Sequence, residues 1–330
     1  MQDDSTITIP PTHPSEAQSQ HSENASASQS PESFAADAMR QRLRQRIRRM
    51  FPIAALLFLL TCASTWAVGG PEYATAVMGI LLAHELGHYV QTLYHRVPAS
   101  PPLFIPMPFV PFGTMGAVIV QGSGFADRRA LFDIAISGPL AGLIVAIPVA
   151  WYGLQTSEIV EVTAESTAMI WGDPLILEWL IELKHGPLAE NQEVVLNPLL
   201  FAGWVGIFIT ALNLMPIGQL DGGHIMYTLI GRHSHLVANG VILGAFLWMI
   251  YTLDIAYALM VGLLIMFGTR HPPTADDSAR IGPVRAVLGV LTLAFVVIGF
   301  TPRPLTIHQP DPQPIQLPGE AVAVDRKSVV

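Results

Sequence analysis

The residues best placed to do chemistry lie in GILLAHELGHYVQTL, residues 79–93, where two histidines flank a glutamate. Residues four apart on a helix are one turn apart and about 40° from each other around the axis. The imidazoles of His84 and His88 can therefore bind one metal ion, with Glu85 placed to act as a base toward water. The motif lies in an apolar run, where a carboxylate costs about 2.5–3.5 kcal/mol at mid-membrane. We therefore favour a metal site over the alternative, a structural polar cluster between helices.

A catalytic zinc site usually has three protein ligands and one open position. The best candidate for the third ligand is Asp221, because Pro216 and Gly218 end an apolar segment just before it. A carboxylate is then presented at a break in the backbone. Asp221 could instead be the N-cap of a helix over 222–231. His224 is a rival ligand, or a donor that orients another ligand.

The composition indicates a membrane protein. Hydrophobic residues make up 51% of the 330 residues and charged residues only 13%, with a mean hydropathy of +0.45. A soluble domain has about 25% charged residues. Apolar runs approach the roughly 20 residues of a membrane span at 51–68, 74–94, 131–153, 198–217, 236–252, 254–269 and 284–300. We predict an all-α multi-pass membrane protein with six to seven transmembrane helices. The net charge of −8, with no dense Lys/Arg face, argues against nucleic acid as a partner.

The composition also changes along the chain. We expect a disordered cytoplasmic tail over 1–37, a basic juxtamembrane segment over 38–50, a membrane domain over 51–302 and a disordered tail over 303–330. The membrane domain includes an extramembrane insertion at 155–197, for which we expect a pair of surface-lying helices. Arginines beside a first span keep that side in the cytoplasm. We thus predict a cytoplasmic N-terminus, in a bacterial inner membrane or an equivalent one; no pattern indicates an oligomeric state.

Two stretches between the spans have unusual backbone chemistry. Residues 98–113 contain six prolines, which prevent a regular helix, and 113–125 combine glycines with β-branched residues. Such backbone is tolerated at membrane depth only where it lines protein or a watery cavity. We predict a re-entrant strand or hairpin near the site; the alternative is an ordinary cytoplasmic loop. The edge of such a strand could form backbone hydrogen bonds with an unwound segment of a substrate. The pairing segment would include Gly113, Gly116, Val118 and Val120.

Four segments together resemble a known family. HELGH (84–88) and NLMPIGQLDGG (213–223) occur in that order on separate apolar segments, with FGTMGAV (112–118) and ISGPLAGL (136–143) between them. The set resembles the site-2 protease family of intramembrane zinc metalloproteases, in the branch without PDZ or CBS domains, which includes chloroplast and bacterial members. The similarity covers about residues 50–300.

The resemblance implies an intramembrane endopeptidase that cuts transmembrane substrate proteins in regulated intramembrane proteolysis. It implies that His84, His88 and Asp221 bind one zinc ion per chain. Glu85 would then be general base and acid, and Asn213 would support the substrate or the oxyanion. Cobalt, iron or manganese can occupy similar ligands.

One departure from the family pattern concerns the third span. Many members have an asparagine shortly after its Gly-Pro pair, whereas Ala141 and Gly142 follow Gly138–Pro139–Leu140 here. No polar role can therefore be carried over to that position. The competing class of function is a non-proteolytic membrane protein: a zinc-bound scaffold or chaperone, or a metal transporter. A transporter would need polar residues along a pathway through several spans, and the spans contain few.

Overall fold

The structure is a computed structural model, and it is mostly helical. The predicted tails lie largely outside the described residues, as does most of the apolar run 254–269. The described residues are 31–121, 124–161, 168–170, 172–189, 192–252, 261–262, 264–266, 268–269, 271–301 and 306–308.

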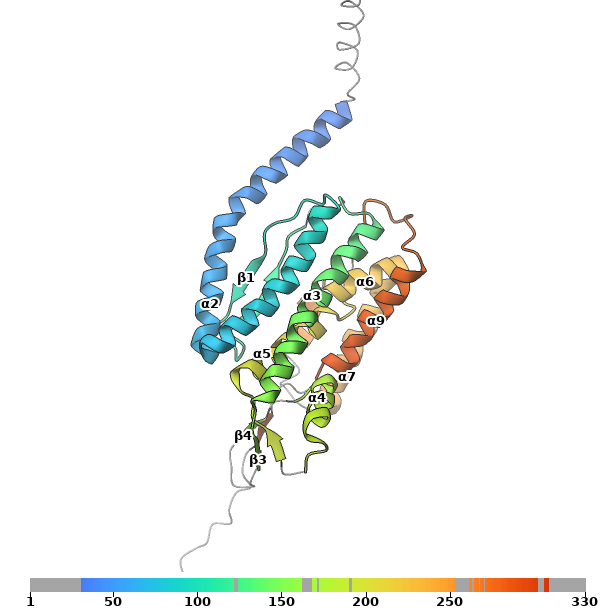
Figure 1. Cartoon of the computed structure of the whole chain (residues 1–330). Helices are drawn as coiled ribbons and strands as arrows, with labels where there is room; N and C mark the ends of the chain where they lie inside the picture. Colours follow the sequence, from blue (N-terminus) through green and yellow to red (C-terminus); the bar gives the residue numbers. More distant parts are fainter. Residues whose placement is uncertain are drawn as a thin grey trace, which may run out of the picture.

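Helix α2 (Pro31–Tyr94) is bent into two arms at Gly70, whose φ of 78° breaks the helical backbone. Figure 1 shows the chain reversing its direction at this bend. The first two predicted spans are these two arms. Residues 31–37 of the segment that we predicted to be disordered belong to this helix, and residues 1–30 lie outside the described residues.

Helix α3 (Arg128–Gln155) runs through the middle of the bundle between the second arm of α2 and α9 (Pro283–Gly299) (Figure 1). It also packs against α5 and α6, whereas α7 packs against α6. The side chain of Asp127 caps the start of α3 by accepting from the Ala130 N–H at 2.7 Å. Trp204 and Tyr73 are fully buried in the main core. The helices of the bundle are α3 (Arg128–Gln155), α5 (Pro198–Asn213), α6 (Asp221–Ile230), α7 (Ser234–Thr252) and α9 (Pro283–Gly299).

Three helical stretches within the described residues are long and apolar enough to cross a membrane: Ile47–Tyr94, Arg128–Gln155 and Asp221–Thr252. The first, at 48 residues, contains both arms of α2. Helices α5 and α9 are apolar but shorter. The predicted count of six to seven spans is therefore not confirmed, because hydropathy reports apolar length and not where a helix bends or ends.

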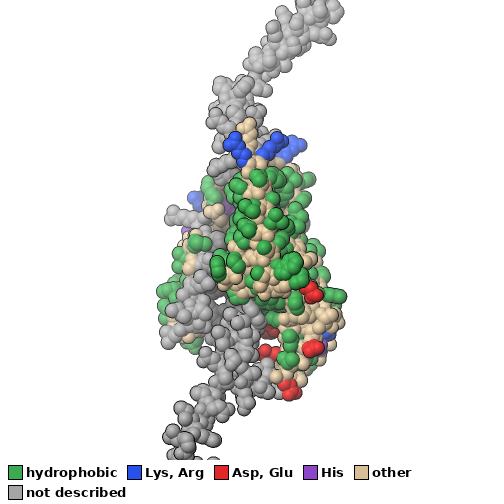
Figure 2. All heavy atoms as spheres, turned by 90° about the vertical axis from the view of Figure 1, so that its left-hand side faces the viewer, with side chains coloured by type: hydrophobic (Ala, Val, Ile, Leu, Met, Phe, Trp, Pro, Cys, Tyr) green, Lys and Arg blue, Asp and Glu red, His purple; other side chains and the backbone are tan. Residues whose placement is uncertain are grey.

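Figure 2 shows one apolar face, over the first arm of α2, with arginines at one end and acidic residues at the other. Its exposed side chains include Phe51, Leu56, Leu59 and Trp66, each 49–65% exposed. A soluble protein rarely exposes so continuous an apolar surface. This is the surface of a membrane protein, with lipid as its surroundings.

The segment 113–125, predicted to be a strand or hairpin, contributes one strand, and the partner of this strand lies in the proline-containing stretch 98–113. Strand β1 (Leu103–Pro106) pairs antiparallel with β2 (Thr114–Val118). It packs on α2, where Ser64 Oγ donates to the Gly113 carbonyl at 2.6 Å. Gly113 has a φ of 71°, and a Cβ there would lie 2.9 Å from the Thr65 Cα. Only glycine combines this conformation with so close an approach.

Within its described residues, the insertion after α3 contains one helix, α4 (Leu175–His185), and short strands, whereas a pair of helices was expected. The β-branched residues around 159–161 favour extended backbone. Residues 306–308 form β6, so the tail predicted from 303 onward is not wholly irregular; backbone pairing over three residues leaves no trace in composition. Strands β3 (Ile159–Glu161) and β5 (Gln192–Val194) pair, as do β4 (Ala168–Ile170) and β6 (Thr306–His308).

The second arm of α2 lies very close to α3 at Gly87. A Cβ at Gly87 would be 2.5 Å from the Ser137 carbonyl oxygen, whereas one at Gly79, on the same helix, would meet nothing within 4 Å. Small residues let helix backbones approach in this way.

We expect Gly87→Ala to destabilise the protein by about 1–3 kcal/mol, the usual cost of overpacking. The matched control Gly79→Ala should be neutral or should stabilise by up to about 1 kcal/mol, because alanine is the better helix former. The melting temperature of the purified protein in detergent measures both. Equal melting temperatures would show that the two helices do not meet at Gly87.

Candidate metal centre

The second arm of α2 carries the HELGH motif on the side that faces the bundle. His84, Glu85 and His88 are 3%, 5% and 6% exposed, so all three are buried. Leu86 and Val90, on the opposite side of the same helix, are exposed. The helical period thus turns the polar residues inward and the apolar residues toward lipid.

Asp221 reaches the same place because the chain breaks between α5 and α6. Pro216 cannot continue the helical hydrogen bonds, and Gly218 adopts a φ of 51°. A Cβ at Gly222 would lie 1.9 Å from the Leu214 carbonyl oxygen, so glycine lets the start of α6 pack on this turn. Asp221 is the first residue of α6, and the N-cap position belongs to Leu220. Asp221 is therefore not the N-cap of this helix, which was the alternative role expected for it.

Three donor atoms form a nearly equilateral triangle. Asp221 Oδ2 lies 3.2 Å from the Nε2 atoms of both His84 and His88, and these two nitrogens are 3.2 Å apart. For a tetrahedral zinc ion with ligands at ~2.0–2.1 Å, the distance between two ligands is about 3.3–3.4 Å. The triangle therefore fits one such ion. Within the described residues, this is the one group of three His, Cys, Asp or Glu side chains close enough to hold a metal.

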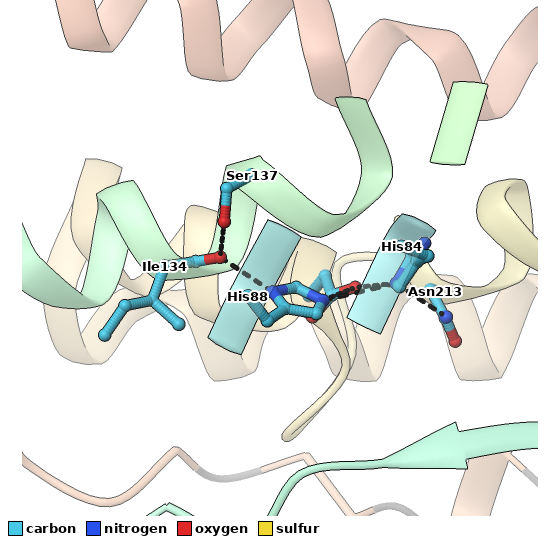
Figure 3. Close-up of polar contacts among 6 residues, drawn as sticks. His84, His88, Ile134, Ser137 and Asn213 are labelled. Atoms are coloured by element: carbon cyan, nitrogen blue, oxygen red, sulfur yellow. Dashed lines mark hydrogen bonds and ion pairs between the residues drawn. The ribbon is translucent and has the colours of Figure 1, made fainter. Parts of the chain in front are cut away.

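The protons on these side chains also point to a cation. Nδ1 of His88 lies 2.7 Å from the Ile134 carbonyl, which also accepts from Ser137 Oγ at 2.8 Å (Figure 3). A carbonyl only accepts, so in neutral His88 the proton is on Nδ1 and Nε2 presents a lone pair. That lone pair faces a carboxylate oxygen and a second imidazole. Groups of this kind repel one another unless a cation lies between them, and imidazole with carboxylate is a donor set that suits zinc.

Two glycines on α3 make room for the two imidazoles. A Cβ at Gly138 would lie 2.1 Å from Nε2 of His88, and one at Gly142 would lie 3.1 Å from Nδ1 of His84. Our sequence reasoning found no polar role at this place in the third span, and it missed this steric role. The signal was present as glycines four residues apart in ISGPLAGL, which places both on one face of α3.

The triangle opens into a cavity of about 560 Å³. Glu85 lines this cavity, as does Asn213, whose Nδ2 lies 3.5 Å from Nε2 of His84 (Figure 3). Val118 and Val120 of the hairpin line it as well. The other two residues predicted for the pairing segment, Gly113 and Gly116, are not among the lining residues. His224 lines the cavity but does not belong to the triangle.

We expect Gly138→Ala to reduce bound metal well below one ion per chain, because the added methyl group would overlap the imidazole of His88. Gly142→Ala should reduce it less, since its contact of 3.1 Å needs only a small shift. Metal content of the purified protein by mass spectrometry measures both, with Gly79→Ala as the control. Full metal content in Gly138→Ala would contradict the close packing.

Several known proteins are similar to this chain. The probable zinc metalloprotease EGY1, chloroplastic, of Arabidopsis thaliana is 32% identical over 239 residues, which is 69% of this chain and 42% of that protein. The Oryza sativa subsp. japonica protein of the same name is 30% identical, over 69% and 40%. The probable zinc metalloprotease EGY2, chloroplastic, of Arabidopsis thaliana is 27% identical, over 68% and 40%. The chain thus spans about two fifths of the length of these relatives.

The model of peptidase family M50 matches residues 72–253, which is more than half of the chain. The matched range contains the second arm of α2, α3, and the break between α5 and α6, so it includes every side chain of the metal triangle. The chain therefore belongs to peptidase family M50, the site-2 protease family.

Proposed function

We propose that this chain is a zinc-dependent endopeptidase that hydrolyses peptide bonds of transmembrane proteins in regulated intramembrane proteolysis. The observation that carries the proposal is the convergence of His84, His88 and Asp221 on one point beside Glu85, in a cavity between apolar helices. The names of the relatives, which call them probable zinc metalloproteases, support the choice of metal and of reaction class.

The residues divide the chemistry between them. A zinc ion held by the triangle would act as a Lewis acid toward a carbonyl group and would acidify water. Glu85 takes a proton from the attacking water and delivers it to the leaving amine. The amide of Asn213 donates to the substrate carbonyl oxygen as negative charge develops there. The scissile bond would lie in the cavity that the triangle lines.

The non-proteolytic alternative, a zinc-bound scaffold or chaperone, leaves Glu85 unexplained. This carboxylate is 5% exposed and does not belong to the metal triangle. A buried carboxyl group is costly, and a scaffold gains nothing from it. A hydrolase needs such a group beside the metal as its proton carrier.

Glu85→Gln should retain about one zinc per chain and lose cleavage of a model transmembrane substrate by at least about 10²–10⁴-fold, the usual contribution of a general acid–base group. His84→Ala should lose both zinc and cleavage. Purified variants in lipid nanodiscs, with zinc measured by mass spectrometry and cleavage by gel, provide the test. Cleavage that persists in Glu85→Gln would remove its role, and a native chain that binds zinc but never cleaves would favour the scaffold.

A transmembrane substrate must unwind before its peptide bonds can be attacked, and the freed backbone groups then need partners. The described part of the chain offers a strand edge, because β2 pairs with β1 on one side only. Val118 and Val120, 49% and 57% exposed, lie two residues apart beside the metal triangle. We infer that the opened substrate lies along this strand.

A cross-linking experiment tests this arrangement in a Cys62→Ser, Glu85→Gln chain that binds but does not cut. Val118→Cys and Val120→Cys should each form a disulfide with a substrate carrying one cysteine near its cut site. Leu103→Cys should form much less, because Leu103 lies on β1, on the paired side of β2, and does not line the cavity. Equal cross-linking at all three positions would argue against strand pairing.

We also propose that the arginine-bearing end of α2 faces the cytoplasm. Figure 2 shows Lys or Arg side chains at one end of the apolar face and acidic side chains at the other. Arg48 and Arg49 come just before the first apolar run, which begins at Phe51. Positive charge beside a first span holds that end on the cytoplasmic side. The proposed setting is a bacterial inner membrane or an equivalent bilayer.

A further inference from the structure

His224 occupies a special place in the catalytic cavity. It follows Asp221 by three residues on α6, so both side chains lie on the same face of this short helix. It lines the cavity and is only partly buried. The metal triangle is complete without it. The imidazole of His224 therefore lies in the same cavity as the metal triangle but has no role in the mechanism proposed above.

A chain of hydrogen bonds fixes the tautomer of His224. Nδ1 of His271 contacts the carbonyl oxygen of Pro272, and Nε2 of His271 lies 2.6 Å from Nδ1 of His224. A carbonyl oxygen carries no proton, so Nδ1 of His271 must donate. In neutral His271, Nε2 then has only a lone pair and must accept from the Nδ1–H of His224. Burial lowers the pKa of His271, which favours the neutral ring.

The consequence is an acceptor atom on a side chain that borders the cavity. With its proton held on Nδ1, neutral His224 presents a lone pair at Nε2. None of the hydrogen bonds among the described residues uses this nitrogen, and the side chain borders the cavity. The other nitrogen of His224 is committed to His271, so the ring cannot turn over without losing that bond.

The segment that carries His271 is itself fixed in place. The ring of His271 stacks on Tyr227, with centroids 4.2 Å apart and an angle of 23° between the planes. The hydroxyl of Tyr227 donates to Asp277 Oδ2 at 2.9 Å. The Ala275 N–H donates to the Ala126 carbonyl at 2.8 Å, next to the start of α3. His271 is therefore held against α6 by contacts on both sides.

We propose that Nε2 of His224 accepts a hydrogen bond from a backbone N–H of the bound substrate, close to the scissile bond, and that His271 is the positioning residue that fixes the required tautomer. This inference rests on the proposed peptidase function. A substrate strand brings N–H groups that have lost their helical partners, and each needs an acceptor in the cavity. Glu85 and the metal ligands are occupied by the chemistry, whereas His224 has its lone pair available.

The test uses the full chain in nanodiscs and a synthetic transmembrane substrate whose cut site is mapped by mass spectrometry. In a series of substrates, one peptide bond at a time near that site is replaced by an ester bond, in which an oxygen stands in place of the N–H and cannot donate a hydrogen bond. For the native chain, one ester position should lower kcat/KM by about tenfold, as expected for the loss of one hydrogen bond. His224→Phe should lower kcat/KM for the normal substrate by a similar factor. In His224→Phe, the ester at that same position should cause no further decrease in kcat/KM.

The variants of His271 separate positioning from general damage. His271→Phe keeps a ring to stack on Tyr227 but cannot accept from His224, so sensitivity to that ester position should fall. His271→Gln retains an accepting oxygen and should preserve it. All variants should keep zinc near one ion per chain, which also checks that they fold.

Each outcome has a distinct meaning. If His224→Phe remains as sensitive to the ester as the native chain, the acceptor role is wrong while the peptidase function stands. If His224→Phe loses its zinc, His224 is a ligand, and the inference is again overturned. If the native chain leaves the normal substrate uncut, the proposed function itself fails, and the role of His224 fails with it.

Discussion

The electrostatic requirement at the metal triangle is the constraint on which the rest of the structure depends. His84, His88 and Asp221 bring three acceptor atoms within 3.2 Å of one another, among buried apolar helices. The carbonyl of Ile134 holds the proton of His88 on its far nitrogen, so the lone pair faces inward. Three such groups repel one another in a medium of low dielectric constant. A cation bound between them would turn this repulsion into attraction, and a donor set of two imidazoles and a carboxylate suits zinc.

Helix packing supplies the precision that this arrangement needs. Gly87 lets the second arm of α2 approach α3, and Gly138 and Gly142 leave space for the imidazoles on the facing side. The same logic applies at the start of α6, where Gly222 packs on the preceding turn. In a bilayer, helices gain little from the hydrophobic effect, so close contact between small residues takes over part of its role. The glycines thus have two effects: they allow the close helix packing that stabilises the bundle, and they leave space for the imidazoles of the site.

The proposed cleavage of transmembrane substrates gives a reason for the irregular backbone beside the metal triangle. A peptide bond inside a substrate helix is protected by its own hydrogen bonds, so hydrolysis requires an opened segment and new partners for it. The hairpin, with Val118 and Val120 on the cavity wall, offers one edge, and His224 offers an acceptor next to Asp221. In the proposed function, both features provide polar partners near the point of attack, while the outer surface of α2 is apolar (Figure 2).

The sequence by itself determined the parts of this protein that follow from local periodicity. Helical spacing placed His84 and His88 on one face, and the proline and glycines near Asp221 predicted a break that presents its carboxylate. Hydropathy located the apolar segments but not the bend that joins two of them in α2. Only the tertiary structure decided that Gly138 lies against an imidazole and that His271 fixes the tautomer of His224. Such contacts join residues far apart in the chain, and no periodic pattern records which distant segments will meet.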